Sequence, residues 1–245
     1  ITSLDAMLAK GKVSFPLTNS WYLPAFYMGA GGTLFGEDGT DAKSGVQFGG
    51  ETGAEVTRYL VRLRNNPNFV NDKNGSGLAG LKSGKVDVVF TGNWDAAVVR
   101  EALGDDWGVA KLPTFNLNGK PVQMKAFAGS TVYAWNPYTK HPVAADQFAA
   151  FLAGTYSQEQ HYKMRSVIPS DVEVAAIPEV KADAVAQAQI DTIAEASVTQ
   201  PSIAEMANFW STCENFGNSI YNNEVTEDNA ADLTDKWMAT YKHLL

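Results

Sequence analysis

The chain has 245 residues, of which 45% are hydrophobic and 19% are charged, and its formal net charge is −8. This composition supports a sizeable core and argues against wholesale disorder, and no run approaches the ~18 apolar residues of a membrane span. An acidic chain without a basic patch cannot neutralise phosphates, which argues against a nucleic-acid partner.

Helix and strand patterns alternate along the first half of the chain, which predicts an α/β fold. The pattern predicts, in order, a helix over 56–63, a strand over 85–90, a helix over 98–103, a strand over 108–112 and a strand over 127–135. Gly92 ends the strand over 85–90, and Asn93 is a candidate cap for the helix that follows. Asn118-Gly119 has the composition of a two-residue hairpin turn.

The second half is predominantly helical. We expect helices over 142–152, from Ser157 to before Pro169, over 180–195, over 202–221 and over 227–243, with 166–178 as a linker. Pro142 suits a first helical position, the spacing of Ser157 and Gln160 matches a capping box, and Thr226 is a candidate cap for the last helix.

Catalytic and metal-binding motifs are largely missing. The single cysteine, Cys213, lies in an apolar helical stripe, which predicts a buried thiol. None of His141, His161 and His243 has the second histidine or cysteine neighbour that a zinc site needs. Residues 75–80 match G-x-G-x-x-G, but turn-like residues precede them where a nucleotide site needs a strand. We therefore predict no cofactor and no metal, and a polar loop before a short helix at 75–80.

Aromatic residues stand where elements begin or where polar and apolar stretches meet, notably at Trp21-Tyr22, Trp94 and Trp210. A ring stacked on a pyranose buries C–H groups and leaves the sugar hydroxyls to nearby polar side chains. The polar side chains close by in sequence are Asn19, Asn93, Asp95, Glu205 and Asn208.

The alternative is that the tryptophans are core residues. Trp210 shares helical spacing with Ile203, Met206 and Cys213, which favours that interpretation at this position. The remaining tryptophans, which are Trp107, Trp135 and Trp237, are interpreted as packing residues.

An ordered series of short stretches carries a family resemblance. They are NSWY at 19–22, GAGG at 29–32, LKSGKV at 81–86, TGNW at 91–94, KLPTF at 111–115, AFAG at 126–129, SQEQ at 157–160 and MANFW at 206–210. In this order they resemble the extracellular solute-binding proteins of carbohydrate ABC transporters, in the branch that includes maltose-binding protein. The resemblance covers essentially the whole chain.

The resemblance implies a periplasmic-binding-protein-like fold of type II. It implies sugar-stacking roles for Trp21, Trp94 and Trp210, with Tyr22 beside the first ring and Asn19 near a polar contact. We add Asn93 and Glu205 to the expected sugar-binding set.

The resemblance also implies that a further N-terminal segment belongs to the first lobe, because family members begin with an α/β segment that this chain lacks. The expected division is 1–125 as an α/β second-lobe domain, 126–169 as a crossing segment of the first lobe and 170–245 as a helical return to the second lobe. The chain opens at Ile1 rather than at methionine, so the missing leader says nothing about compartment.

The function expected from these observations is non-catalytic oligosaccharide binding in a bacterial ABC importer, with hinge closure around the sugar. The expected partners are an oligosaccharide, the membrane permease subunits and the missing N-terminal segment, and the expected location is extracytoplasmic, as a cell-surface lipoprotein or in the periplasm. Two alternatives remain open: a glycoside hydrolase or transferase with Asp95 and Glu205 as its carboxylates, and a structural interaction domain with interior tryptophans.

Overall fold

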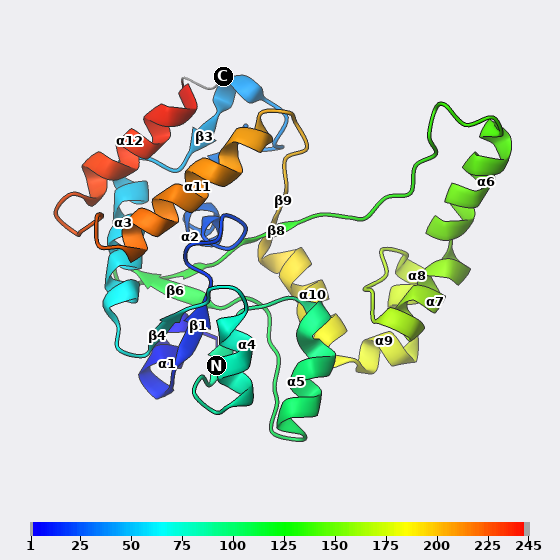
Figure 1. The fold of residues 1–245 in the computed structure, drawn as a ribbon, viewed down its shortest axis with the longest axis horizontal. Coiled ribbons are helices and arrows are strands. Elements are labelled where there is room, and N and C mark those ends of the chain that lie inside the picture. Colours follow the sequence, from blue (N-terminus) through cyan, green and yellow to red (C-terminus); the bar gives the residue numbers. More distant parts are fainter. Residues whose placement is uncertain (1, 243–245) are drawn as a thin grey trace.

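The computed structural model describes residues 2–242 and shows a main body with a long helical excursion to one side (Figure 1). The first part of the body contains α1 (Leu4–Lys10), β1 (Val13–Phe15), α2 (Pro24–Gly29), β2 (Thr33–Leu34), η1 (Ala42–Ser44), β3 (Val46–Gln47), α3 (Gly50–Asn65), β4 (Phe69–Asn71), α4 (Ser76–Lys82), β5 (Val88–Val89), η2 (Asn93–Asp95), α5 (Ala96–Leu103), β6 (Thr114–Leu117) and β7 (Lys120–Gln123). Helices alternate with the parallel strands β1, β4 and β5 here, as the α/β prediction requires.

The remaining elements leave the body and return to it. They are β8 (Ala126–Ala128), α6 (Pro142–Ala153), α7 (Thr155–Arg165), α8 (Val172–Ala175), α9 (Pro178–Ala182), α10 (Ala184–Glu195), β9 (Ser197–Thr199), α11 (Met206–Tyr221) and α12 (Ala230–Lys242). β8 and β9 pair in parallel where the chain leaves and re-enters the body, and α11 and α12 then pack onto it (Figure 1).

A three-stranded parallel sheet organises the body. Its order is β4-β1-β5, with Val13 opposite both Phe69 and Val88. β1 is buried along its whole length, as expected of a central parallel strand. Separate two-stranded pairs are formed by β2 with β3 and by β6 with β7.

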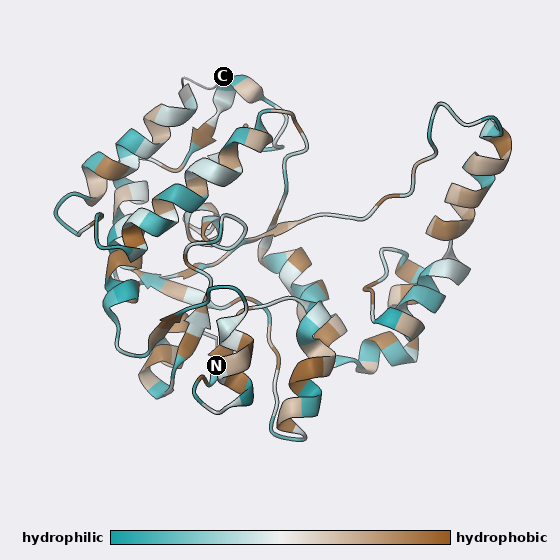
Figure 2. Cartoon of the chain, viewed as in Figure 1, coloured by the Kyte–Doolittle hydropathy of each residue, from teal (hydrophilic) through white to brown (hydrophobic). Residues whose placement is uncertain are grey.

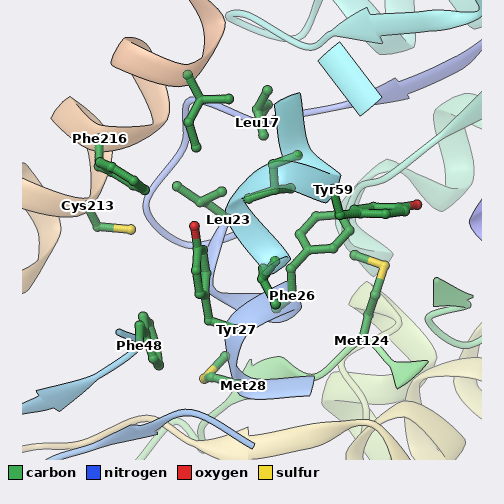
Figure 3. Packing of buried hydrophobic residues seen from close by; sticks show 14 of the residues in the cluster. Leu17, Leu23, Phe26, Tyr27, Met28, Phe48, Tyr59, Met124, Cys213 and Phe216 are labelled. Atoms are coloured by element: carbon green, nitrogen blue, oxygen red, sulfur yellow. The ribbon is translucent and has the colours of Figure 1, made fainter. Parts of the chain in front are cut away.

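The hydrophobic core joins α2, α3, α11 and α12, and it is rich in aromatic rings (Figure 3). Tyr27 is buried among these rings, and its hydroxyl lies 2.8 Å from Thr57 Oγ1. Thr57 Oγ1 lies 2.6 Å from Thr234 Oγ1, so the buried hydroxyls satisfy one another across three helices. A satisfied buried hydroxyl avoids a desolvation cost of about 1–3 kcal/mol.

The excursion is less well packed than the body. Its own small cluster contains the buried residues Tyr162, Val180 and Ala186. No residue of α6 is buried, and Figure 2 shows hydrophobic residues along that helix. Large side chains stand exposed on this part of the chain at Val132, Tyr133, Trp135, Tyr138, Val143, Phe148, Phe151, Tyr156, Met164, Val167 and Val172.

Two strand predictions are wrong. The strand predicted over 127–135 is only β8, and residues 129–135 are exposed with no strand beside them. Residues 108–112 also form no strand. A β-branched pattern alone does not make a strand, because its backbone groups need a neighbouring strand to pair with. The strand predicted over 85–90 is confirmed only at its centre, as β5.

Several helix boundaries also differ from the prediction. Asn93 is not a cap: it begins η2, and its side chain donates to the carbonyl oxygen of Ser166. Ser157 lies inside α7, where its hydroxyl donates to the carbonyl oxygen of Phe151 in α6, so its polar group joins the two helices instead of capping α7. The predicted linker over 166–178 contains α8, whose first backbone amides donate to Asp171.

The predicted helix over 180–195 is divided at Asp183, whose carboxylate accepts from the amide of Val185 and caps α10. The last two helices begin later than predicted, at Met206 and Ala230. Thr226 precedes α12 by a turn, and its Oγ1 accepts from the amide of Asn229 at 3.4 Å. The predicted end at His243 lies outside the described residues. Within residues 2–242, no helix combines the length and apolarity needed to cross a membrane.

Candidate functional site

The loops that leave the three parallel strands meet at one edge of the sheet. They line a pocket of about 350 Å³. Its walls include Asn19 after β1, Asp72 and Asn74 after β4, and Thr91, Trp94 and Asp95 after β5, together with Tyr22. The carboxyl ends of parallel strands are the usual ligand-binding edge of an α/β sheet.

Hydrogen bonds between neighbouring loops hold this edge together. The amide of Leu17 donates to Asn71 Oδ1 at 3.0 Å, and the amide of Asp72 donates to the carbonyl oxygen of Phe15 at 3.0 Å. On the other side, the amide of Phe90 donates to the carbonyl oxygen of Ser14 at 3.1 Å. The pocket wall is thereby built onto the sheet rather than onto independent loops.

Tyr22 supplies a hydroxyl to this pocket. Its ring packs edge-on against Phe15, with 6.1 Å between ring centroids. Burial raises the pKa of Tyr22, and the nearby carboxylates of Asp95 and Asp72 raise it further. The phenol therefore stays protonated at neutral pH and can donate a hydrogen bond, while the carboxylates accept.

Trp94 lies on the loop that follows β5, and its side chain is 69% exposed. Hydrogen bonds fix the turn that carries it: Thr91 Oγ1 donates to Asp95 Oδ2 at 2.5 Å, and the amide of Asp95 donates to the carbonyl oxygen of Gly92 at 3.2 Å. Asn93 Nδ2 donates to the carbonyl oxygen of Ser166 at 3.3 Å. An exposed indole on a fixed turn is suited to contact a ligand.

Three rings from distant parts of the chain form an aromatic platform, defined here as Trp21, Phe127 and Trp210. The rings of Trp21 and Trp210 lie within 19° of parallel, with 6.0 Å between centroids. Buried Phe127 supports both, at 5.4 Å from Trp21 and 5.7 Å from Trp210. Trp21 is 37% exposed and Trp210 half-buried, so the platform retains surface for a flat ligand.

The predicted residues thus fall into two neighbouring groups. Trp21 and Trp210 meet in the platform, and Asn19, Tyr22 and Trp94 meet in the pocket. Trp21 and Tyr22 are consecutive, so one loop serves both groups. Asn19 shapes this loop, because its Oδ1 accepts from the amide of Trp21 at 2.8 Å. Among residues 2–242, Trp94 has no ring–ring contact with the platform.

Asn93 and Glu205 belong to neither the platform nor the pocket lining. Asn93 uses its amide to hold residue 166, and Glu205 occupies the position before α11. Glu205 is not among the residues that line the pocket, whereas Asp95 is.

The other tryptophans differ in their surroundings. Trp237 is buried against Phe216, with 4.3 Å between ring centroids, which confirms a packing role. Trp135 is 42% exposed, so its predicted packing role is wrong within the residues described. Trp107 lies beneath the guanidinium of Arg100, 4.8 Å from the ring centroid.

Sequence reasoning missed several contributors to the site. Phe127 supports the platform, and Asp72 and Asn74 line the pocket, yet none of the three is among the candidates drawn from the sequence. Recognising the strand β4, which ends at Asn71, would have indicated Asp72 and Asn74, because residues that follow a parallel strand lie at the binding edge. The polar loop predicted at 75–80 is wrong except at Gly75, because Ser76 already begins the short helix α4.

A second pocket, of about 400 Å³, lies between α1, α3 and the β6–β7 hairpin. Both carboxylate oxygens of its Asp5 already accept hydrogen bonds: Tyr59 Oη donates to Asp5 Oδ1 at 3.3 Å, and the backbone amide of Asn116 donates to Asp5 Oδ2 at 2.8 Å. It offers no exposed ring. In the part of the chain that the structure describes, no group of His, Cys, Asp and Glu is arranged to hold a metal ion.

Comparison with known proteins gives consistent matches. The model of the family described as bacterial extracellular solute-binding protein matches residues 1–188. A maltooligosaccharide ABC transporter solute-binding lipoprotein of Streptococcus pneumoniae (strain ATCC BAA-255 / R6) is 28% identical over 202 residues, which are 81% of this chain and 46% of that protein.

Two solved structures share the fold. A protein solved with acarbose is 45% identical, with a TM-score of 0.90 over 98% of this chain and 63% of that chain. The maltodextrin binding protein MalE1 from L. casei BL23, solved without ligand, is 26% identical, with a TM-score of 0.89 over 98% of this chain and 65% of that chain. The periplasmic-binding-protein-like fold predicted from the resemblance is thereby confirmed.

The chain spans about half the length of the Streptococcus relative and less than two thirds of either solved chain. Both solved structures nevertheless match the fold over 98% of this chain. By the match over residues 1–188, the chain belongs to the bacterial extracellular solute-binding proteins, an extracytoplasmic family of binding proteins rather than enzymes.

Proposed function

We propose that this chain forms part of the oligosaccharide receptor of a bacterial ABC importer, and that it binds sugar without transforming it. The observation that carries the proposal is the pair of nearly parallel rings, Trp21 and Trp210, on one buried support. Beside them lies a pocket with a protonated phenol, carboxylates, amides and an exposed indole. Apolar faces next to hydrogen-bonding groups match the two kinds of surface that a pyranose presents.

Maltooligosaccharides are the proposed sugar class. The names of the relatives support this choice, since one is a maltooligosaccharide-binding lipoprotein and another a maltodextrin binding protein. The structure solved with acarbose belongs to a protein that is 45% identical to this chain.

The proposed roles follow the geometry. Trp21, Trp210 and Trp94 stack on sugar rings, and Tyr22 and Asn19 hydrogen-bond hydroxyl groups at the sheet edge. Asn93 and Glu205 are proposed to contact the sugar once the binding cleft is complete.

A complete cleft needs a second wall, which we propose is supplied by a segment of the protein N-terminal to residue 1. In this arrangement 1–125 belong to the second lobe, 126–169 cross to the first lobe and 170–245 return. The exposed apolar side chains of the excursion, including Phe148 at 60% and Val143 at 71%, support a covering partner there. This chain spans only part of the length of its relatives, which supports a further segment too. Hinge bending would then close the two lobes around the sugar.

The proposed protein partners are the membrane permease subunits of the importer. The name of the Streptococcus relative, which is an ABC transporter lipoprotein, supports both this partner and anchoring at the cell surface.

An enzymatic role for Asp95 and Glu205 is not proposed. The carboxylate of Asp95 accepts a hydrogen bond from Thr91 and lines the pocket, whereas Glu205 does not line it. A glycosidase needs both carboxyl groups beside one bond.

Isothermal titration calorimetry on the full-length protein tests the proposal. Maltotetraose should bind in a saturable one-to-one complex, whereas cellotetraose, which has the same sugar with β-linkages, should bind far more weakly. The Trp94→Ala variant should lose most of the affinity. Equal binding of both sugars, release of reducing sugar, or no binding of either would overturn it.

A further inference from the structure

The Trp94 indole does not stand alone in the pocket wall: it folds back over Gly92. A Cβ atom placed on Gly92 would lie closer than 3.0 Å to three carbon atoms of the six-membered part of that indole. Real Cβ atoms do not approach other atoms so closely, so the ring and any side chain at position 92 exclude each other.

The backbone at this position does not itself require glycine. Gly92 has φ −100° and ψ 174°, which is extended backbone that any residue adopts. The space taken by the Trp94 ring is therefore the structural reason for a residue without a side chain here.

We propose that Gly92 is the positioning residue of the Trp94 indole: its bare backbone forms a seat for one face of the ring and leaves the opposite face to the sugar. This inference rests on the proposed function, in which Trp94 stacks on a sugar. Because Trp94 is 69% exposed, a displaced ring can swing into solvent at little cost to folding. Loss of the seat is thus expected to reduce sugar binding rather than stability.

A Gly92→Ala variant tests the proposal, with Gly108→Ala as the matched control. Gly108 has ordinary φ, and a Cβ atom there would meet no atom within 4 Å. In the full-length protein, Gly92→Ala should weaken maltotetraose binding about tenfold, the loss of one stacking contact. Gly108→Ala should leave it unchanged, and both melting temperatures should stay within a few degrees of the parent.

The double variant separates seating from folding. In a Trp94→Ala background the added methyl group has no ring to displace, so Gly92→Ala should cause no further loss of affinity. An equal loss in both backgrounds would overturn the proposal. If Gly92→Ala alone fails to fold, restored folding in the double variant would support the seat and continued failure would overturn it.

A readout without sugar keeps this proposal separate from the proposed function. In protein labelled with 7-fluorotryptophan, whose fluorine avoids the three contacting ring carbons, each of the six tryptophans of residues 1–245 contributes a ¹⁹F resonance. The resonance missing from Trp94→Ala identifies Trp94. Gly92→Ala should move that resonance and leave the others in place, whether or not maltotetraose binds. An unmoved Trp94 resonance would overturn the seat, whereas normal sugar binding by Trp94→Ala would overturn only the sugar-stacking role that the proposed function gives to Trp94.

Discussion

Trp21 and Trp237 carry the same side chain in opposite surroundings. Trp21 is 37% exposed on the aromatic platform, whereas Trp237 is 5% exposed and stacked on Phe216 between α11 and α12. Local sequence identified the candidate rings because each stands at a predicted element start or where a polar stretch meets an apolar one. It misjudged Trp135, because the exposure of a ring depends on which distant segments pack over it.

Replacing these two tryptophans should therefore have different consequences. Trp237→Ala should cost about 3–5 kcal/mol of unfolding free energy, as expected for a buried aromatic residue. Trp21→Ala should cost about 1 kcal/mol and should weaken maltotetraose binding about tenfold. Urea denaturation and calorimetry measure the two quantities, and equal destabilisation by both variants would contradict the assignment of Trp21 to the platform.

Buried tyrosines should make the free energy of unfolding decline at alkaline pH. Burial raises the pKa of Tyr27, Tyr59 and Tyr241 above their ordinary value. The folded state keeps these phenols protonated while the unfolded state loses the protons above about pH 10. Their contribution is present below that pH and declines above it, by up to about 1.4 kcal/mol per tyrosine per pH unit.

Melting temperatures between pH 8 and 11.5 measure this effect. They should fall steeply above pH 10, and Tyr27→Phe should make the fall shallower. Tyr138→Phe is the control, because Tyr138 is 91% exposed. A melting temperature that stays level through pH 11, or equal slopes in both variants, would contradict the explanation.

At the scale of elements, turns and helix starts were predicted correctly where neighbouring residues alone determine them. The hairpin turn at Asn118-Gly119 is confirmed, with φ of 52° and 83°, and Pro142 does begin α6. Capping signals failed where a side chain found another partner, as Ser157 did with the carbonyl of Phe151. Strand signals at 108–112 and 129–135 failed because no strand lies beside them, which local sequence does not encode.

The hairpin offers a clean test of backbone strain. Gly119 has positive φ, and a Cβ atom there would meet no atom within 4 Å, so a substitution changes backbone energy alone. Gly119→Ala should lower the free energy of unfolding by about 1 kcal/mol. The same substitution at Gly108, which has ordinary φ and open space, should leave it unchanged or raise it slightly. Chemical denaturation would contradict this if both variants behaved alike.

At the scale of the whole molecule, the body and the excursion differ in how completely they are packed. A single aromatic core joins elements from α1 to α12, whereas the excursion has a small cluster of its own. The α/β class and the ordered motifs of the family could be predicted from sequence. The pairing of β8 with β9, which brings Phe127 beneath Trp21 and Trp210, could not, because it joins residues about seventy positions apart.

Limited proteolysis tests whether the excursion needs a covering segment. Residues 129–140 contain exposed aromatic side chains and no helix or strand, so chymotrypsin should cut residues 1–245 first at Tyr133, Trp135 or Tyr138. In the full-length protein those bonds should be cut much more slowly. Equal cutting in both proteins would show that nothing covers this surface.

The most direct measurement is a crystal structure of the full-length protein with maltotetraose. Sugar rings should lie on the exposed faces of Trp21, Trp210 and Trp94, with the Tyr22 hydroxyl within hydrogen-bonding distance of a sugar oxygen. A tetrasaccharide bound elsewhere, or one that leaves those indoles without contact, would contradict the assignment of this sheet edge as the binding site.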